Sequence, residues 1–221
     1  MNLAIFDLDN TLLAGDSDYL WGRYLVEHKR VDGEHYEREN QRFYDEYTCG
    51  TLDILEFLRF SLRPLTEHKL EEMLALRQQF MAEKIQPLIL PAARRLVEKH
   101  RQQGHELMII TATNRFVTEP IAAELGIDNL IATDPEFKNG VYTGEVSGTP
   151  SFREGKVERL NDWLKQTGGN LASSWFYSDS HNDLPLLEMV THPIAVDADS
   201  TLTAHASAKG WPVISLREPV A

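Results

Sequence analysis

Short runs of apolar residues that end in polar residues recur along the chain, and each run predicts a buried β-strand. The runs cover residues 3–6, 107–110, 175–177, 194–196 and 213–214. Between them, apolar residues recur with helical periodicity over residues 92–103, 116–125, 155–166 and 184–190. Asn139-Gly140, placed between alternating residues, predicts a β-hairpin. Strands and helices in alternation predict an α/β fold with a mainly parallel sheet.

Residues 15–87 lack the strand pattern and show amphipathic helical periodicity. Breaks in that periodicity fall near residues 31–33, 49–50 and 63–64. The segment holds half of the chain's aromatic residues, and most of them should lie in a core because they follow helical spacing. We therefore predict two domains, an α/β core of residues 1–14 and 88–221 and an inserted helical cap of residues 15–87.

Composition places the chain among ordinary globular proteins. Its 221 residues include 22 Lys and Arg against 34 Asp and Glu, a formal charge of −12. An acidic chain without a basic tract is a poor ligand for nucleic acid. No apolar stretch approaches the ~18 residues of a membrane span, and the amino terminus lacks a signal-peptide pattern. The single cysteine, Cys49, fits a reducing compartment and should be buried or half-buried. We expect a cytoplasmic monomer or homodimer that binds neither nucleic acid nor membranes.

Two carboxylates follow the first predicted strand directly, in Asp7-Leu8-Asp9-Asn10-Thr11. In an open α/β sheet, ligands bind at this carboxyl end of the strands. Successive positions of an extended strand face opposite ways, so Asp7 and Asp9 can serve one site only if the chain turns there. The alternative interpretation is a turn or helix cap built from Asp and Asn.

Other polar residues follow the later strands. The second strand ends at Thr111-Ala112-Thr113-Asn114, whose hydroxyl and amide groups suit a phosphate, although Thr111 also suits a helix N-cap. The third ends near Asp179 and Asp183, and Asp183 could equally cap the helix that follows. Lys156 lies at the start of a predicted helix, where a positive charge is slightly unfavourable. Either another group holds the lysine there, or it is a solvated surface residue.

Four carboxylates gathered at one sheet edge would repel one another unless a cation lies among them or some keep their protons. Oxygen ligands beside a phosphate fit Mg²⁺, which binds one or two carboxylates and retains water. One carboxylate could then attack phosphorus while another transfers a proton. The pattern therefore indicates metal-assisted chemistry on a phosphate ester.

The residues at 7–11, Thr111, Lys156 and the pair Asp179 and Asp183 resemble, in order, the four motifs of the haloacid dehalogenase superfamily of phosphatases. The resemblance spans nearly the whole chain. The helical segment after the first motif is similar to the small cap of the phosphoserine-phosphatase-like branch (subfamily IB), some of whose bacterial members hydrolyse amino-alcohol phosphates such as histidinol phosphate. The resemblance thus implies a Rossmann-like core with an inserted cap and a Mg²⁺-dependent phosphatase activity on a small-molecule phosphate ester.

The resemblance also implies roles for individual residues. Asp7 would be the nucleophile that becomes an aspartyl phosphate, and Asp9 would protonate the leaving group and later activate water, which requires a raised pKa. The implied metal ligands are Asp7, the main-chain carbonyl of Asp9, and Asp179, with Asp183 at or just behind the metal. The implied phosphate-binding residues are Thr111, Ala112, Lys156 and Asn182.

Substrate selection is expected from the cap. The resemblance implies that Asp16, seven residues after Asp9, faces the site and binds a substrate amine with help from Asp18; alternatively either residue caps a helix. A phosphoserine carboxylate would need a cation such as Arg59 or Arg63. The aromatic residues Tyr19, Trp21, Tyr44 and Tyr47 could instead stack on an imidazole. The acidic, aromatic composition favours L-histidinol phosphate over L-phosphoserine or a broad range of small metabolites.

The main alternative from another class is a phospho-accepting signalling module, which also combines an aspartate, a Thr, a Lys and Mg²⁺. Asp9 argues against it, since an acid two residues after the nucleophile serves turnover, and so does the long helical lid. A phosphomutase, which returns the phosphoryl group to a sugar, is a second alternative.

Overall fold

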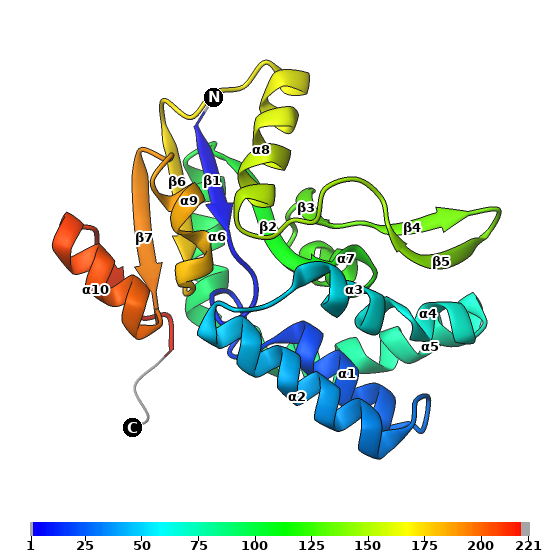
Figure 1. The fold of residues 1–221 in the computed structure, drawn as a ribbon. Helices are drawn as coiled ribbons and strands as arrows, with labels where there is room; N and C mark the ends of the chain where they lie inside the picture. The colour runs from blue at the N-terminus through cyan, green and yellow to red at the C-terminus, as the bar shows by residue number, and fades with distance from the viewer. Residues whose placement is uncertain (1, 218–221) are drawn as a thin grey trace.

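A six-stranded parallel sheet organises the computed structural model, which describes residues 2–217 (Figure 1). The strands are β1 (Leu3–Phe6), β2 (Glu106–Asn114), β3 (Asn129–Thr133), β6 (Ser174–Ser178), β7 (His192–Val196) and β8 (Val213–Ile214). Their order across the sheet is β3-β2-β1-β6-β7-β8, and every neighbouring pair is parallel. Because Phe6 at the end of β1 pairs with Ile109 and Tyr177, the residues after β1 emerge at the centre of the carboxyl edge.

Helices cover both faces of this sheet, as the alternation of strands and helices predicts. One face packs against α6 (Pro91–Gln102) and α7 (Arg115–Glu124), and the other against α8 (Glu154–Thr167), α9 (Leu184–Leu187) and α10 (Ser200–Lys209). Successive residues of β1 and β2 alternate between these two cores. Strands buried on both sides require continuous apolar runs, which explains the pattern from which they were predicted.

Residues 15–87 form the predicted set of helices, called the helical insert below. It contains α1 (Ser17–Glu27), α2 (Gly33–Cys49), α3 (Ile54–Leu62), α4 (Pro64–Glu67), α5 (Leu70–Phe80), a π-helical turn (Met81–Ile85) and a 3₁₀ turn (Gln86–Leu88). The three predicted breaks fall between helices, and a further break that was not predicted separates α4 from α5 at residues 68–69. An isolated bridge between Leu13 and Ile89 joins the two ends of the insert.

The hairpin is present as predicted, and four details differ from the sequence-based prediction. Strands β4 (Pro135–Lys138) and β5 (Val141–Val146) form the predicted hairpin, with Asn139 and Gly140 both at positive φ, 52° and 85°. Strand β3 and helix α10 were not predicted, and β2 runs on to Asn114. Cys49 is exposed, contrary to expectation, because it ends α2 on the solvent side.

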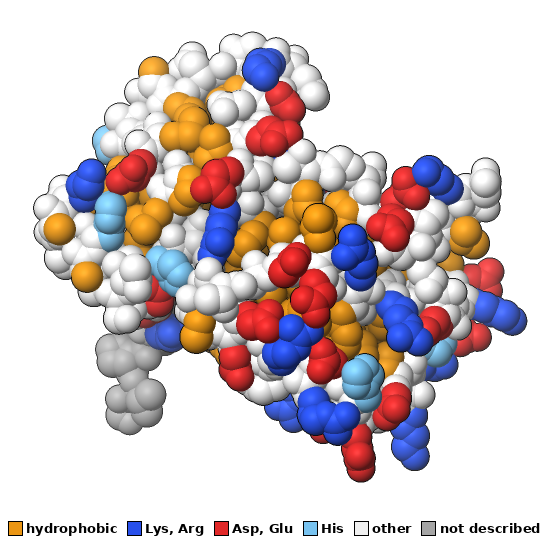
Figure 2. Space-filling model, viewed as in Figure 1, with side chains coloured by type: hydrophobic (Ala, Val, Ile, Leu, Met, Phe, Trp, Pro, Cys, Tyr) orange, Lys and Arg blue, Asp and Glu red, His pale blue; other side chains and the backbone are white. Residues whose placement is uncertain are grey.

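The surface mixes charges of both signs. Figure 2 shows Asp, Glu, Lys and Arg side chains interspersed over the helical insert, with no continuous basic patch on the face in view. Arg42, for example, forms ion pairs with Glu39, Glu46 and Glu56. Among the described residues, no helix is both long and apolar enough to cross a membrane.

Candidate active site

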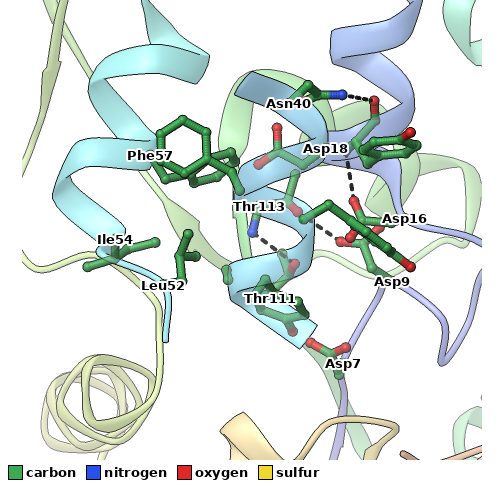
Figure 3. Close-up of a pocket in the computed structure, with 15 residues that line it drawn as sticks. Asp7, Asp9, Asp16, Asp18, Asn40, Leu52, Ile54, Phe57, Thr111 and Thr113 are labelled. Carbon is green, nitrogen blue, oxygen red and sulfur yellow. Dashed lines mark hydrogen bonds between the residues drawn. The ribbon is translucent and has the colours of Figure 1, made fainter. Parts of the chain in front are cut away.

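A pocket lies between the carboxyl edge of the sheet and the helical insert (Figure 3). Its floor comes from the residues after β1 and from the end of β2, and its walls come from α1, α2 and α3. The lining residues are Asp7, Asp9, Asp16, Asp18, Tyr19, Asn40, Phe43, Tyr44, Tyr47, Leu52, Ile54, Phe57, Thr111, Ala112 and Thr113. Lysine and arginine are both missing from this lining, whereas four aspartates are present.

The chain makes the turn that a shared site for Asp7 and Asp9 requires. Asn10 adopts a left-handed conformation with φ of 55°, and the N–H groups of Leu12 and Leu13 donate to the carbonyl of Leu8. Asn is one of the few residues that tolerate this conformation. Both carboxylates therefore reach the pocket from one short segment.

Lys156 is buried between two carboxylates at the floor of the site. Its Nζ lies 2.8 Å from Asp7 Oδ1 and 2.7 Å from Asp183 Oδ1, and the lysine side chain is 2% exposed. Burial alone would lower the pKa of Lys156, but Asp183 and Asp7 raise it above its ordinary value. The lysine is therefore charged and held by its partners, and the surface alternative is wrong.

Asp183 holds Lys156 in place. Its Oδ2 accepts hydrogen bonds from Ser178 Oγ at 2.7 Å and from Lys156 Nζ at 2.9 Å. It precedes α9 but makes no side-chain cap bond to that helix. Since both of its oxygens contact Lys156, Asp183 acts on the lysine rather than as a helix cap.

Asp7 and Asp9 both sit in surroundings that favour their protonated forms. Burial, assisted by repulsion from Asp183, raises the pKa of Asp7 to about 7 against the opposing effect of Lys156. Burial and repulsion from Asp16 raise the pKa of Asp9 to about 6. A carboxyl with such a pKa can give and take a proton near neutral pH.

Two hydrogen bonds aim the Asp9 carboxylate. Its Oδ1 accepts from the N–H of Ser17 at 2.6 Å, and its Oδ2 accepts from Thr113 Oγ1 at 2.8 Å. Neither donor was singled out from the sequence. The repeat of threonine at 111 and 113 is a signal for Thr113, whereas only the three-dimensional turn brings Ser17 near.

Asp179 completes the group of carboxylates. Its Oδ1 accepts from Thr11 Oγ1 at 3.2 Å, and burial together with repulsion from Asp7 and Asp183 raises its pKa well above the ordinary value. A hard cation beside Asp7 and Asp179 would relieve this repulsion, so the oxygen donors fit Mg²⁺. Within residues 2–217, no group of three or more His, Cys, Asp or Glu side chains is close enough to bind a metal, so main-chain oxygen and water would supply the other ligands.

The predicted phosphate-binding residues occupy different settings. Thr111 lies inside β2, 1% exposed, and Asn114 rather than Thr111 caps α7 by accepting from the N–H of Val117. Ala112 lines the pocket. Asn182 is buried, and its amide accepts from Arg153 Nε at 3.0 Å and donates to the carbonyl of Tyr47 at 3.2 Å, which ties it to the helical insert.

Asp16 caps a helix, as one of its two interpretations predicts, and its place in the pocket leaves the binding of a substrate amine a prediction. Its Oδ1 accepts from the N–H of Tyr19 at 2.8 Å, which caps α1, and the residue also lines the pocket. Burial raises its pKa. The pocket lining does not include Arg59 or Arg63, and Arg63 pairs with Glu67 at the surface.

Of the four aromatic residues proposed for an imidazole, three line the pocket: Tyr19, Tyr44 and Tyr47. Trp21 does not, because it is buried in the core and packs edge-on against Phe80. Phe43 and Phe57, which the sequence did not single out, take its place in the lining.

Comparison with known proteins assigns the family. A sequence profile of the haloacid dehalogenase-like hydrolases matches residues 4–188. A histidinol-phosphatase of Neisseria meningitidis serogroup C (strain 8013) is 47% identical over 220 residues, which cover 98% of this chain and 99% of that protein. A phosphoserine phosphatase of Mycobacterium tuberculosis (strain ATCC 25618 / H37Rv) is 29% identical over 219 residues, covering 97% of this chain and 70% of that protein.

Solved structures agree on the fold. A protein of unknown function from Bordetella pertussis Tohama I superposes with a TM-score of 0.92 at 45% identity, covering 98% of this chain and 99% of that one. A phosphoserine phosphatase with a phospho-aspartyl intermediate analogue superposes with a TM-score of 0.72 at 20% identity, covering 98% and 94%. The chain therefore belongs to the haloacid dehalogenase-like hydrolases, as the order of its motifs indicates. Within that family it is a phosphatase.

Proposed function

We propose that this phosphatase hydrolyses L-histidinol phosphate with Mg²⁺ through an aspartyl-phosphate intermediate. The observation that carries the reaction is the placement of buried Asp7, bonded to Lys156, beside Asp9, whose pKa of about 6 suits proton transfer. Asp7 provides a nucleophile and Asp9 an acid in one pocket.

In the first step, an Asp7 carboxylate oxygen forms a bond to phosphorus as the ester O–P bond breaks. Protonated Asp9 gives its proton to the leaving oxygen, which departs as an alcohol. Lys156 and the Thr111 hydroxyl stabilise the negative charge on the phosphoryl oxygens as it moves. Asp183 keeps the lysine ammonium in position for this role.

In the second step, water attacks the phosphorus of the aspartyl phosphate. Asp9, now a carboxylate, takes the proton from that water, and the bond between phosphorus and the Asp7 oxygen breaks. Inorganic phosphate leaves, and both aspartates return to their starting states. The hydrogen bonds from Ser17 and Thr113 keep Asp9 directed at the reacting atoms during both steps.

When bound, Mg²⁺ would neutralise charge on the carboxylates and on the transferring phosphoryl group. Asp7, Asp179 and the main-chain carbonyl of Asp9 are the proposed ligands. Asp183 lies behind Lys156 with both oxygens already engaged, so its contribution to the metal is indirect.

We further propose that residues 1–14 and 88–221 act as the catalytic core and that residues 15–87 act as a cap that selects the substrate and excludes water. The cap supplies most of the pocket wall, including Asp16, Asp18 and the aromatic rings. The negative net charge and the mixed surface fit a cytoplasmic monomer or homodimer whose partner is a small molecule.

The pocket lining favours histidinol phosphate as the substrate. Its ammonium and imidazole groups suit a wall of aspartates and aromatic rings. The carboxylate of phosphoserine would find no lysine or arginine in that lining and would face Asp16 and Asp18 instead. The 47% identity to a histidinol-phosphatase points the same way.

A phosphate-release screen tests the proposal. With Mg²⁺ present, the purified enzyme is assayed on histidinol phosphate, phosphoserine, sugar phosphates and nucleotides, with Asp7→Asn as the inactive control. We expect a preference for histidinol phosphate of about a hundredfold in kcat/KM, or ~2.7 kcal/mol. A flat profile would instead identify an enzyme of broad specificity.

A further inference from the structure

Four carboxylates follow one another along the pocket. Figure 3 shows them in the order Asp7, Asp9, Asp16 and Asp18, from the end near Thr111 to the end near Asn40. Asp7 and Asp9 act at the phosphate ester in the proposed reaction. Asp16 and Asp18 lie beyond them, in the part of the pocket farther from Thr111.

Asp18 lies in the first turn of α1 but, unlike Asp16, makes no cap bond to it. Asp16 already caps α1, and the Asp18 carboxylate accepts no hydrogen bond from another residue within 2–217. Burial and the neighbouring Asp16 and Asp9 raise the pKa of Asp18 well above its ordinary value. An acid kept in such surroundings without a partner is stabilised by a cationic or N–H-donating ligand.

The wall around Asp18 is aromatic and rigid. Phe43 and Phe57 pack edge to face, with ring centroids 5.3 Å apart. Asn40 Nδ2 donates to the carbonyl of Tyr19 at 3.0 Å, which fixes α1 against α2 and so fixes Asp18 relative to these rings. A carboxylate beside aromatic rings suits a flat ring that carries N–H donors.

We propose that Asp18 is the residue that recognises the imidazole of the substrate, by accepting a hydrogen bond from a ring nitrogen while the ring packs against Phe43 and Phe57. This inference rests on the proposed function. The groups of histidinol phosphate follow the order phosphate, ester oxygen, ammonium and imidazole. The pocket offers Asp7, Asp9, Asp16 and Asp18 in the same order, so each carboxylate meets one group.

The test compares two substrates that differ only in the ring. In 2-aminopropyl phosphate the ester and ammonium remain, and a hydrogen replaces the imidazole. Wild type and Asp18→Asn are assayed on both substrates with Mg²⁺. We expect the ratio of kcat/KM for histidinol phosphate to that for 2-aminopropyl phosphate to fall at least about tenfold in the variant, mainly through KM, since a neutral amide oxygen replaces the charged acceptor of the hydrogen bond.

Two control variants separate recognition from general damage. Asp32→Asn removes another acid of the insert that lies outside this pocket, and it should keep the wild-type ratio. Asp18→Glu restores the carboxylate and should recover part of the lost ratio. The thermal unfolding of each variant confirms that it is folded.

The assays distinguish a failure of the proposed substrate from a failure of the proposed role of Asp18. If wild type hydrolyses 2-aminopropyl phosphate and histidinol phosphate with equal kcat/KM, the proposed substrate is wrong, and the role of Asp18 fails with it. If wild type prefers histidinol phosphate and Asp18→Asn keeps that preference, the substrate stands and the role of Asp18 is refuted. Equal losses on both substrates would also refute it.

Discussion

The most constrained residue of the site is Lys156. A lysine ammonium enclosed between Asp7 and Asp183 is stable only because both carboxylates remain within hydrogen-bonding distance. The same contacts restrain the carboxylate of Asp7, the proposed nucleophile. One side chain therefore supports the stability of the site and, in the proposed mechanism, the reaction as well.

Removing this ammonium should damage both properties. We expect Lys156→Met to lower the phosphate-release rate by about a hundredfold or more, because a charge aimed at the phosphoryl oxygens is lost. We also expect about 3–5 kcal/mol less stability in urea at pH 8, since Asp7 and Asp183 are left facing each other without a partner. Urea unfolding followed by circular dichroism measures the second effect.

A second substitution separates charge from packing. In the double variant Lys156→Met with Asp183→Asn, the repulsion is reduced, so part of the stability should return while the activity stays low. Stability that remained at the level of Lys156→Met would show that lost packing, rather than repulsion, causes the change.

At the residue scale, sequence patterns located the carboxylates that the fold gathers at the candidate site, but not the residues that hold those carboxylates in place. Asp7, Asp9 and Asp179 stand in recognisable motifs directly after apolar runs. Ser17 and Asn40 do not, because Ser17 reaches Asp9 only through the turn between them, and Asn40 reaches Tyr19 only when α2 packs on α1. Nor could the sequence show that Asp183 points at Lys156.

Among the elements, α2 contacts the loops around the candidate site. Gly50, at φ of 73°, caps its carboxyl end, and the Gly50 carbonyl accepts a hydrogen bond from Arg153. A Cβ built on Gly50 would lie 2.7 Å from His181 Nε2. A side chain at this position would therefore displace either the helix end or the His181 imidazole, which is hydrogen-bonded to Asp199.

Gly50→Ala should consequently do more than strain the backbone. Gly168 ends α8 with a similar φ of 69° and has no neighbour within 4 Å of a built Cβ, so Gly168→Ala measures the conformational strain of about 1 kcal/mol alone. We expect Gly50→Ala to lower the melting temperature further and to raise KM, since either α2 or the His181 imidazole, which is bonded to Asp199, must shift. Equal effects of the two variants on stability and KM would contradict this.

Element predictions succeeded where burial imposes a pattern. The strands in the middle of the sheet are apolar on both faces and stood out in the sequence. Helix α10 did not, because its residues are mostly small or polar and only Leu202 and Ala206 are buried. Strand β3 is short and has polar residues at both ends.

For the whole molecule, the gathered acids make stability depend on pH and metal. Burial and mutual repulsion raise the pKa values of Asp7 and Asp179, so the fold prefers their protonated forms. The metal-free protein should therefore become less stable as pH rises from about 4 through 7, the pKa of Asp7. Bound Mg²⁺ would offset this loss.

Thermal unfolding with Mg²⁺ or EDTA tests this dependence. At saturating metal and pH 8, we expect Mg²⁺ to add about 2–3 kcal/mol, or roughly 5–10 °C, and to add much less at pH 5, where protons compete for the carboxylates. Asp179→Asn should abolish most of the metal effect. A shift of the same size at both pH values, unchanged in Asp179→Asn, would place the metal elsewhere.

The architecture of the whole molecule was partly predictable. Alternating patterns indicate a parallel sheet, but they do not give the strand order β3-β2-β1-β6-β7-β8, which depends on how each crossover packs. The length of the helical insert was readable from the missing strand pattern, whereas its position over the carboxyl edge was implied only by the resemblance to the family.

The bridge between Leu13 and Ile89 brings the chain back to the place from which it departed. Because the helical insert begins and ends at neighbouring positions, its sequence can change without disturbing the strands of the sheet, provided that the apolar surface against α7 is kept. Evolution can then change substrate specificity and the catalytic reaction independently of each other. Replacing the segment between positions 13 and 89 with the corresponding segment of a related enzyme would be the direct route to a new substrate preference.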